Sequence, residues 1–224
     1  MAFETLHTKT SGGAEPPDEG SDLKKEVKEF AKLIAWFLVL FLIIKTYVIE
    51  AYEVQGPSMR PTLETNDRIL VFKLPQALSR LRLFRGLDVI KPGDIIVFDS
   101  PDDEGKRYVK RVLAEGPPKR VFGNTVGAAH NAEDRSERPV SVRIEEGNIY
   151  INNQRVEPPF FHVEELTPTD YAPEVKLGPG EYYVVGDNFH RSKDSRSFRA
   201  VKDDHIVGKA LLRFWPLSKF GLVR

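Results

Sequence analysis

The chain has 224 residues, enough for one sizeable domain with appendages and a well-filled hydrophobic core. Lysine plus arginine and aspartate plus glutamate each total 33, so the formal net charge is zero and the sequence lacks the basic footprint of a nucleic-acid-binding protein. There is no cysteine, which excludes a disulfide framework and a thiolate metal site but does not identify the cellular compartment.

Residues 1–22 form a polar N-terminal segment. Five acidic residues stand against one lysine among glycine, proline, serine and threonine, and the segment has no apolar face to bury. We therefore predict a disordered tail at 1–22. Ser21 and Asp22 are suited to cap a helix that begins near Leu23.

An apolar helix is predicted next, at 23–49. Residues 33–44 are apolar without interruption, a run that alone would also suit a buried helix. Over the 20 residues of 30–49, however, only two lysines and a threonine are polar. A helix of 20 residues is about 30 Å long, the thickness of a bilayer core, and lysines near its ends can extend toward water. Trp36 and Tyr47 suit the membrane interfaces, so we predict a transmembrane segment.

A cleavable signal peptide is the alternative interpretation of this segment. The long polar leader and the unsuitable cleavage sequence Ile49-Glu50-Ala51 argue against it, and we favour a signal anchor. Lysines gather before Leu33, so the positive-inside rule places residues 1–22 in the cytoplasm and residues 50–224 outside it. The predicted location is the plasma (inner) membrane, crossed once.

Residues 50–224 show the short apolar runs and period-2 alternation of β-strands. Turn residues separate the runs, and outside the anchor a helical pattern occurs only weakly, at 75–84. Strands are predicted at 52–55, 68–72, 95–98, 108–113, 140–144, 149–156 (a hairpin), 182–185 and 207–214 (a pair). A loop or insertion is predicted at 117–139, and the stretch after Pro158 is predicted to be irregular. The fold class is therefore mainly β, an antiparallel sheet domain preceded by one transmembrane helix.

The sequence Gly56-Pro57-Ser58-Met59-Arg60-Pro61-Thr62-Leu63 lies just after the predicted anchor. Two prolines fix φ on either side of Ser58, and Gly56 permits a backbone conformation that a Cβ would block. A serine in such a turn presents its hydroxyl in one direction. On turn chemistry alone the commoner outcome is a hydroxyl bonded within its own turn, so the role of Ser58 depends on the neighbouring motifs.

Four segments in this order resemble the conserved boxes of bacterial type I signal peptidases, serine proteases with a Ser–Lys dyad. The segments are 56–63, 67–73, 93–112 and 186–196. Each box alone is weak evidence, but four boxes in the right order behind one anchor are specific, and the resemblance covers roughly 30–220. It implies a membrane-bound serine endopeptidase that removes signal peptides from exported preproteins through an acyl-enzyme.

The resemblance implies roles for individual residues. Ser58 matches the family's nucleophile and Lys110 its general base. Ser192 matches the hydroxyl that orients the lysine amine, and Asp194 and Arg196 match a supporting ion pair. The candidate residues for the shallow substrate pockets are Tyr52, Val54, Met59, Leu63, Ile69, Tyr108 and Val109. The implied substrates carry small residues, typically alanine, at positions −1 and −3.

The chain departs from the family pattern at several positions. Phe189-His190-Arg191 replaces the usual Arg-Asp-Asn, Gly116-Pro117-Pro118 replaces the usual Pro-Gly-Asp, and Arg199 replaces a common glycine. Gly56 stands where some relatives carry a serine that helps to bind the oxyanion. None of these changes touches the nucleophile or the base, so we expect them to affect loop geometry more than the reaction.

Peptide-bond hydrolysis needs a nucleophile, a proton acceptor and donors aimed at the developing oxyanion. None of the five histidines lies in a segment that pairs it with an acid near the Ser58 turn, whereas a lysine kept neutral by desolvation needs no third acid. The apolar strand around Lys110 suits such burial, and the Ser58 backbone N–H is the natural oxyanion donor. No metal or other cofactor is predicted. Loss of the charge of Lys106 or of Arg111 alone is expected to be tolerated far better than loss of Lys110.

Two alternatives to this function stay open. A self-cleaving repressor-type protease uses a related Ser–Lys dyad, but the anchor and the lack of an N-terminal DNA-binding pattern argue against it. A non-catalytic, membrane-anchored β domain that binds partners would not be acylated at Ser58. The predicted partners are preproteins with N-terminal signal peptides and the lipid bilayer, with the protein-export machinery as a further candidate and no nucleic acid.

Overall fold

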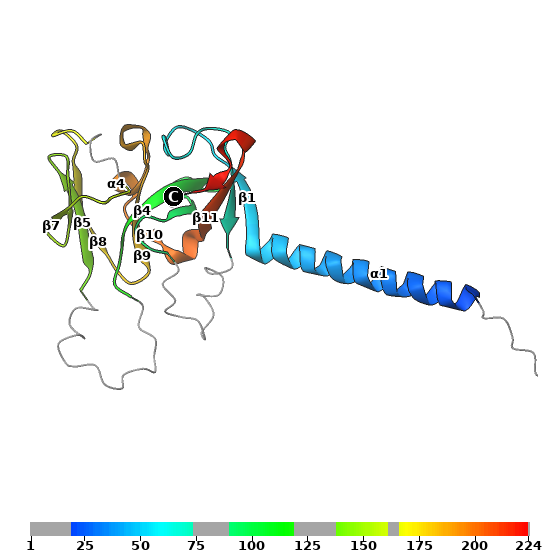
Figure 1. Ribbon diagram of the computed structural model, residues 1–224. Coiled ribbons are helices and arrows are strands. Elements are labelled where there is room, and N and C mark those ends of the chain that lie inside the picture. Colours follow the sequence, from blue (N-terminus) through cyan, green and yellow to red (C-terminus); the bar gives the residue numbers. More distant parts are fainter. Residues whose placement is uncertain (1–18, 74–89, 119–137, 161–165, 224) are drawn as a thin grey trace, which may run out of the picture. The chain divides into compact units, whose positions relative to one another are not determined.

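The computed structural model describes residues 19–73, 90–118, 138–160 and 166–223 of the chain (Figure 1). The chain divides into two compact units, Met1–Ile43 and Ile44–Arg224. The described part of the first unit is helical, and the second is rich in β-strands. Residues 1–18 of the predicted tail, the weak helical pattern at 75–84 and residues 119–137 of the predicted loop lie outside the described residues.

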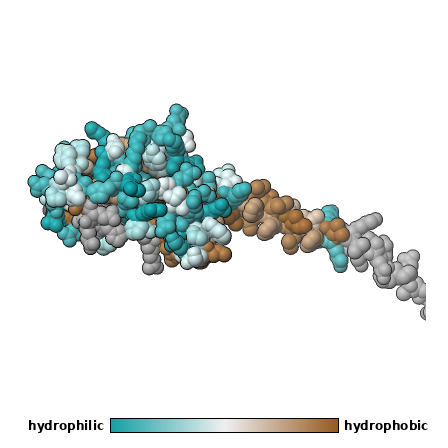
Figure 2. Space-filling model, turned by 90° about the horizontal axis from the view of Figure 1, so that it is seen from above, coloured by the Kyte–Doolittle hydropathy of each residue, from teal (hydrophilic) through white to brown (hydrophobic). Residues whose placement is uncertain are grey.

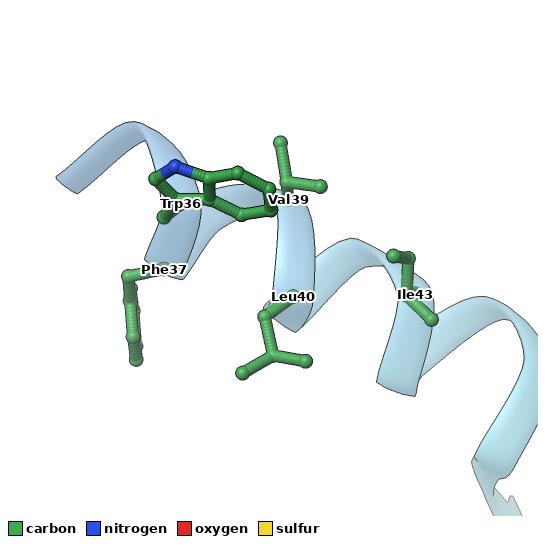
Figure 3. Close-up of a pocket in the computed structure, with 5 residues that line it drawn as sticks. All are labelled: Trp36, Phe37, Val39, Leu40 and Ile43. Atoms are coloured by element: carbon green, nitrogen blue, oxygen red, sulfur yellow. The ribbon is translucent and has the colours of Figure 1, made fainter. Parts of the chain in front are cut away.

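The first unit contains helix α1, Glu19–Ile43. It begins four residues before the predicted start, so Ser21 and Asp22 lie within its first turn and do not precede it as a cap. Exposed apolar side chains cover its C-terminal half and form the brown band in Figure 2. A shallow cavity of about 230 Å³ between these side chains is shown in Figure 3 and is lined by Trp36, Phe37, Val39, Leu40 and Ile43.

The membrane span predicted at 23–49 stays a prediction. Among the described residues, no helix combines the length and the apolar character needed to cross a membrane. Helical geometry continues beyond α1 as the π-helix η1, Ile44–Val48, and ends there. Ile49, predicted as the last residue of the span, instead opens strand β1, Ile49–Glu53, which starts three residues before the strand predicted at 52–55.

The second unit contains an eight-stranded sheet (Figure 1). Its strand order is β1-β2-β11-β3-β4-β9-β10, and β12 pairs with β11. After β1 the strands are β2 Arg68–Phe72, β3 Ile95–Asp99, β4 Arg107–Glu115, β9 Glu181–Val185, β10 Val201–Lys202, β11 Ile206–Trp215 and β12 Gly221–Leu222. Every pairing in it is antiparallel, as predicted.

A second, four-stranded antiparallel sheet has the order β7-β6-β5-β8. Its strands are β5 Val140–Glu145, β6 Asn148–Ile151, β7 Gln154–Val156 and β8 Ala172–Leu177. The inner side chains of this small sheet share one buried cluster with Leu113, Tyr183 and Val185 of the large sheet. The two sheets therefore pack on a common core at the β4–β9 end of the large sheet (Figure 1).

Strand β3 lies inside the large sheet and is buried on both faces. Ile95 and Val97 belong to the cluster that contains Met59 of the Ser58 turn. Ile96 and Phe98 belong to a separate cluster on the opposite face. Burial on both sides explains the unbroken apolar run, because neither face meets water.

Two strand predictions are corrected by the structure. Strand β8 lies in the stretch that was predicted to be irregular. The sequence did not indicate a strand there because the exposed charged residues Glu174 and Lys176 interrupt its apolar residues. The pair of strands predicted at 207–214 is one continuous strand, β11. Gly208 fits inside that strand because its Cα packs on the Phe72 carbonyl oxygen, which a Cβ would approach to 2.4 Å.

The described residues of the second unit also contain four short helical turns: η4 Phe189–Arg191, α4 Ser195–Phe198, η5 Asp203–His205 and η6 Leu217–Lys219. The first two lie in the last of the four predicted boxes, which follows directly on β9. They fold that box back toward the Ser58 turn.

Candidate active site

The Ser58 turn rests on one face of the large sheet. Met59 and Leu63 are buried in the cluster beneath it, and the Leu63 N–H donates to the Met59 carbonyl at 2.8 Å. Gly56 has a φ of +82°, a left-handed conformation that residues with a Cβ rarely adopt. Two buried side chains and one glycine thus fix the direction in which Ser58 projects.

Ser58 and Lys110 meet although 52 residues separate them. Lys110 Nζ lies 2.8 Å from Ser58 Oγ and donates to the Val109 carbonyl at 3.0 Å. Only 4% of Lys110 is exposed. The predicted nucleophile and base are therefore in direct hydrogen-bond contact, as general-base activation requires.

Burial lowers the pKa of the Lys110 amine to about 8, because desolvation penalises its charged form. The carboxylates of Asp194 and Asp187 act in the opposite direction, and the Arg196 guanidinium acts with burial. At pH 8 about half of such an amine is neutral, against about 1 in 250 for an ordinary lysine. Lys110 is thus able to accept a proton at mildly alkaline pH.

The last box reaches the nucleophile through its backbone. The Asn188 N–H donates to the Ser58 carbonyl at 3.0 Å. A Cβ on Gly186 would lie 2.4 Å from that carbonyl oxygen and 2.3 Å from Ser192 Oγ, so this close approach requires glycine. The packing brings Ser192 and Ser58 against the same glycine.

Ser192 does not make its predicted hydrogen bond to the lysine amine in this structure. Its hydroxyl is buried and has no hydrogen-bond partner among the described residues. An unsatisfied buried hydroxyl costs about 1–3 kcal/mol, so this group is held in an unfavourable state. Its role as the orienting hydroxyl stays a prediction.

The ion pair predicted between Asp194 and Arg196 is present. Arg196 Nε and Nη2 donate to the two carboxylate oxygens, each at 2.8 Å, and Asp194 is fully buried. Asp194 also accepts from the Gly186 N–H at 3.1 Å, and the guanidinium lies over the Phe189 ring, 3.4 Å from its centroid. The pair therefore holds both ends of the box in place.

A second buried ion pair was not predicted. Arg111 Nε and Nη2 donate to the two Asp187 oxygens, each at 2.7 Å. Arg111 Nη1 donates to the Gly93 carbonyl at 2.8 Å, and Nη2 lies 3.3 Å from Thr62 Oγ1. Loss of the Arg111 charge would leave a buried carboxylate without its partner, so Arg111 is a poorer control for Lys110 than the exposed Lys106.

One histidine of the last box faces an acid, which the sequence did not indicate. His190 Nδ1 lies 4.0 Å from Asp170 Oδ1, and Asp170 comes from the connection that precedes β8. The hydroxyl of Ser58 contacts Lys110, and His190 and Asp170 are not among the residues that line the cleft described next.

A cleft of about 620 Å³ has both Ser58 and Lys110 in its wall. Five of the predicted substrate-binding residues also line it: Tyr52, Val54, Met59, Tyr108 and Val109. Leu63 and Ile69 do not line it, because both are fully buried in the cluster beneath the turn. These two residues support the floor of the cleft from below.

Charged residues that the sequence did not indicate also line the cleft. They are Glu53, Lys106, Arg107, Arg191 and Lys193. Arg107 donates to Asp99 at 2.9 Å, to Glu50 at 3.3 Å and to the Tyr52 hydroxyl, so it joins β4 to β1. No local pattern marks such residues, since their place depends on which strands the fold brings together.

Strand β4 has one edge available along the cleft. It pairs with β3 over residues 107–111 and with β9 over residues 111–115. Among the described strands, β3 is thus the sole partner of residues 107–110, and all four of these residues line the cleft. An edge of this kind can accept an extended peptide as an added strand.

An antiparallel β fold that brings a serine hydroxyl against a buried lysine amine, in a cleft with a free strand edge, has the features of a serine hydrolase. The chain belongs to the signal peptidase family, peptidase S26, whose model matches residues 27–122 and 139–215, and it is a serine endopeptidase of the signal peptidase I type.

The chain is similar to two curated signal peptidases over most of their length. Signal peptidase IB of Staphylococcus aureus (strain COL) is 30% identical over 199 residues, which covers 88% of this chain and 94% of the relative. "Probable signal peptidase I-2" of Synechocystis sp. (strain ATCC 27184 / PCC 6803 / Kazusa) is 28% identical over 221 residues, which covers 98% and 85%.

A crystal structure of a signal peptidase I from Enterococcus faecalis V583 is 23% identical, covers 53% of this chain and 94% of its own, and has a TM-score of 0.35.

Proposed function

We propose that this chain cleaves signal peptides from exported preproteins, with Ser58 as the nucleophile and Lys110 as the general base. The observation that carries the proposal is the 2.8 Å contact between Ser58 Oγ and a lysine amine that is almost fully buried. Membership of the signal peptidase family supports the substrate class.

The reaction proceeds in two steps. Neutral Lys110 takes the hydroxyl proton while Ser58 Oγ attacks the carbonyl carbon of the scissile peptide bond. The Ser58 N–H stabilises the tetrahedral oxyanion, since Gly56 has no side chain to contribute. The Lys110 ammonium then gives its proton to the leaving amine, which is the new N-terminus of the mature protein.

A water molecule completes the cycle. Lys110, neutral again, accepts a proton from the water as its oxygen attacks the ester carbon of the acyl-enzyme. The ester bond breaks, Ser58 Oγ regains a proton from the ammonium, and the signal peptide leaves with a free carboxylate. Ser192 is proposed to orient the amine during these transfers, from its position beside Gly186.

The substrate is proposed to bind as an extended strand along the free edge of β4. Residues 52–55 also line the cleft, and the peptide is proposed to lie between them and β4. Side chains at −1 and −3 then face Met59, Tyr108 and Val109, large residues that leave room for small substituents. A leucine at −1 should reduce kcat/KM at least about tenfold.

The membrane is proposed to bring enzyme and substrate together. The apolar helix α1 would be the anchor, with the N-terminus cytoplasmic and the β-rich unit on the outer face of the plasma membrane. Nine residues of chain from Ile49 to Ser58 span at most about 30 Å, so the nucleophile would work near the membrane surface. Signal-peptide cleavage sites emerge there, just beyond their apolar segment.

Incubation of the purified full chain with one preprotein tests the proposal. The wild type should release the mature protein, and Ser58→Ala should not. An active-site acylating agent should attach to Ser58 in the wild type alone, which also separates an enzyme from a silent binding domain. Cleavage by Ser58→Ala at the wild-type rate would contradict the proposal.

A further inference from the structure

The cleft beside the dyad is lined by more positive than negative side chains. The basic residues are Lys106, Arg107, Lys110, Arg191 and Lys193, and the acidic residue is Glu53. A binding surface with such an imbalance favours partners that bring negative charge to it. The proposed acyl-transfer chemistry uses only one of these cations, Lys110.

The other cations of the cleft differ in whether the protein already neutralises them. The ion pairs are Lys106–Asp103 at 2.7 Å, Arg107–Asp99 at 2.9 Å and Lys193–Asp102 at 2.7 Å. Arg191 is exposed, and its guanidinium forms no ion pair or hydrogen bond within the described parts of the chain. It is the cleft cation whose charge is left for a ligand.

The backbone that carries Arg191 is firmly held next to the nucleophile. The Arg191 N–H donates to the Asn188 carbonyl at 3.2 Å, and the Arg196 guanidinium donates to the Ser192 carbonyl at 3.3 Å. The same turn is bonded to Ser58 through the Asn188 N–H. The backbone of Arg191 is therefore held by the turn that is bonded to Ser58, and Arg191 is part of the wall of the cleft.

We propose that Arg191 is a specificity-determining residue that binds an acidic side chain of the substrate within about three residues of the scissile bond. The inference rests on the proposed function. An extended peptide advances about 3.3 Å per residue, so three residues correspond to about 10 Å from the bond that Ser58 attacks. A guanidinium suits a carboxylate because its planar fork can donate two parallel hydrogen bonds.

Preproteins with aspartate or glutamate beside their cleavage site would accordingly be the better substrates of this enzyme. A phospholipid headgroup is the competing anion, and the test below separates the two.

The test uses soluble peptides with alanine at −1 and −3 and one glutamate placed in turn at the other positions from −5 to +3. Each has two matched peptides, one with glutamine and one with lysine at the same position. The full chain in neutral detergent is compared with Arg191→Gln, Arg191→Glu and a control, Lys176→Gln. Lys176 is an exposed residue of β8 on the small sheet, so its loss changes the net charge equally without altering the cleft.

At one or two adjacent positions of the peptide near the scissile bond, glutamate should raise kcat/KM about two- to fivefold over glutamine at low salt. This is the size expected of an exposed ion pair. The gain should come through KM and shrink in high salt. It should vanish in Arg191→Gln, persist in Lys176→Gln, and give way to a preference for lysine in Arg191→Glu.

Equal rates for every glutamate and glutamine pair, or a preference that survives Arg191→Gln, overturns the inference and leaves the proposed function intact. Peptide binding to Ser58→Ala gives a second measurement that needs no catalysis. If the wild type cleaves no peptide, the proposed function fails, and the affinities still decide the role of Arg191. A charge effect seen only with anionic lipid vesicles would assign Arg191 to the membrane surface and also overturn the inference.

Discussion

Two buried ion pairs support the residues around the Ser58–Lys110 contact, and they are built in different ways. Asp194 and Arg196 lie two residues apart in one box, and 17% of the arginine side chain stays exposed. Arg111 and Asp187 lie 76 residues apart, with 3% and 2% of their side chains exposed. The first pair organises a local turn, and the second joins strand β4 to the last box through the core.

The difference implies two different roles. The Asp194 carboxylate is the strongest charge acting to raise the pKa of Lys110, and Arg196 offsets it, so the local pair sets the electrostatic environment of the base. The guanidinium of Arg111 bonds to Gly93 and Thr62 as well as to its acid, so the long-range pair holds the walls of the site together. Asp187 also acts on the pKa of Lys110, more weakly than Asp194, so variants of the first pair should shift the pH profile more and variants of the second should cost more stability.

The largest effect is expected from Lys110 itself, on which both pairs act. Lys110→Arg should reduce kcat/KM by about 100- to 10,000-fold, because a guanidinium does not release its proton near neutral pH. In the wild type, kcat/KM should rise with pH through about 8, since the amine must lose its proton to act as a base. Steady-state kinetics from about pH 6 to pH 10 measure both.

Lys106→Gln is the matched control for Lys110. Lys106 lies on the same hairpin and is exposed, with its ion pair to Asp103 at the surface. Its loss should leave the pH profile unchanged, because exposed pairs contribute little. Substantial activity in Lys110→Arg would mean that another group is the base.

The fold was largely predictable because most of its strands are marked locally. The runs at 68–72 and 95–98 are apolar, short and bounded by turn residues, and they coincide with β2 and nearly with β3. Strand β8 was missed because its exposed face carries two charges and a proline, which local reasoning assigns to a loop. Its place is decided by the buried cluster between the two sheets, which no single segment encodes.

The residues of the candidate site also fall into those with a local sequence signal and those without one. Ser58, Lys110 and the Asp194–Arg196 pair lie in continuous motifs, so each was identified from its own segment. Other contacts depend on which distant strands the fold brings together, so no local sequence pattern predicts them. They are the Arg111–Asp187 pair and the hydrogen bond from Arg107 of β4 to Glu50 of β1. Of the two ion pairs, Asp194–Arg196 is thus predictable from the local sequence, and Arg111–Asp187 depends on the topology of the sheet.

Next in size is the effect of breaking the long-range pair. Arg111→Met should lower the free energy of unfolding by about 3–5 kcal/mol, because it leaves the Asp187 carboxylate buried and unpaired. Urea denaturation of the full chain, followed by tryptophan fluorescence, measures it. The double variant Arg111→Met/Asp187→Leu should recover most of the loss. Equal stabilities for the wild type and the single variant would show that the pair does not hold the site together.

Breaking the local pair should cost less stability and change the chemistry more. Arg196→Met should destabilise by about 1–3 kcal/mol, since the Asp194 carboxylate keeps hydrogen bonds from the backbone N–H groups of Gly186 and residue 196. The pKa of Lys110 should rise, and the acidic limb of kcat/KM should move to higher pH. Asp194→Asn should move that limb in the opposite direction. A limb that stays in place in both variants would make the local pair purely structural.

The smallest effect is expected at Ser192, whose hydroxyl forms no hydrogen bond with either ion pair. Its hydroxyl is buried without a hydrogen-bond partner, so Ser192→Ala removes an unsatisfied polar group and should leave the free energy of unfolding equal or slightly higher. If the hydroxyl orients the Lys110 amine during the reaction, the same variant loses one neutral hydrogen bond and should be about two- to tenfold slower. Stability and rate would then move in opposite directions, which a merely structural role cannot produce.

Parallel denaturation and steady-state kinetics on Ser192→Ala and Ser192→Thr test this prediction, because threonine keeps the hydroxyl and should preserve more of the rate. An unchanged rate in Ser192→Ala removes this residue from the catalytic site.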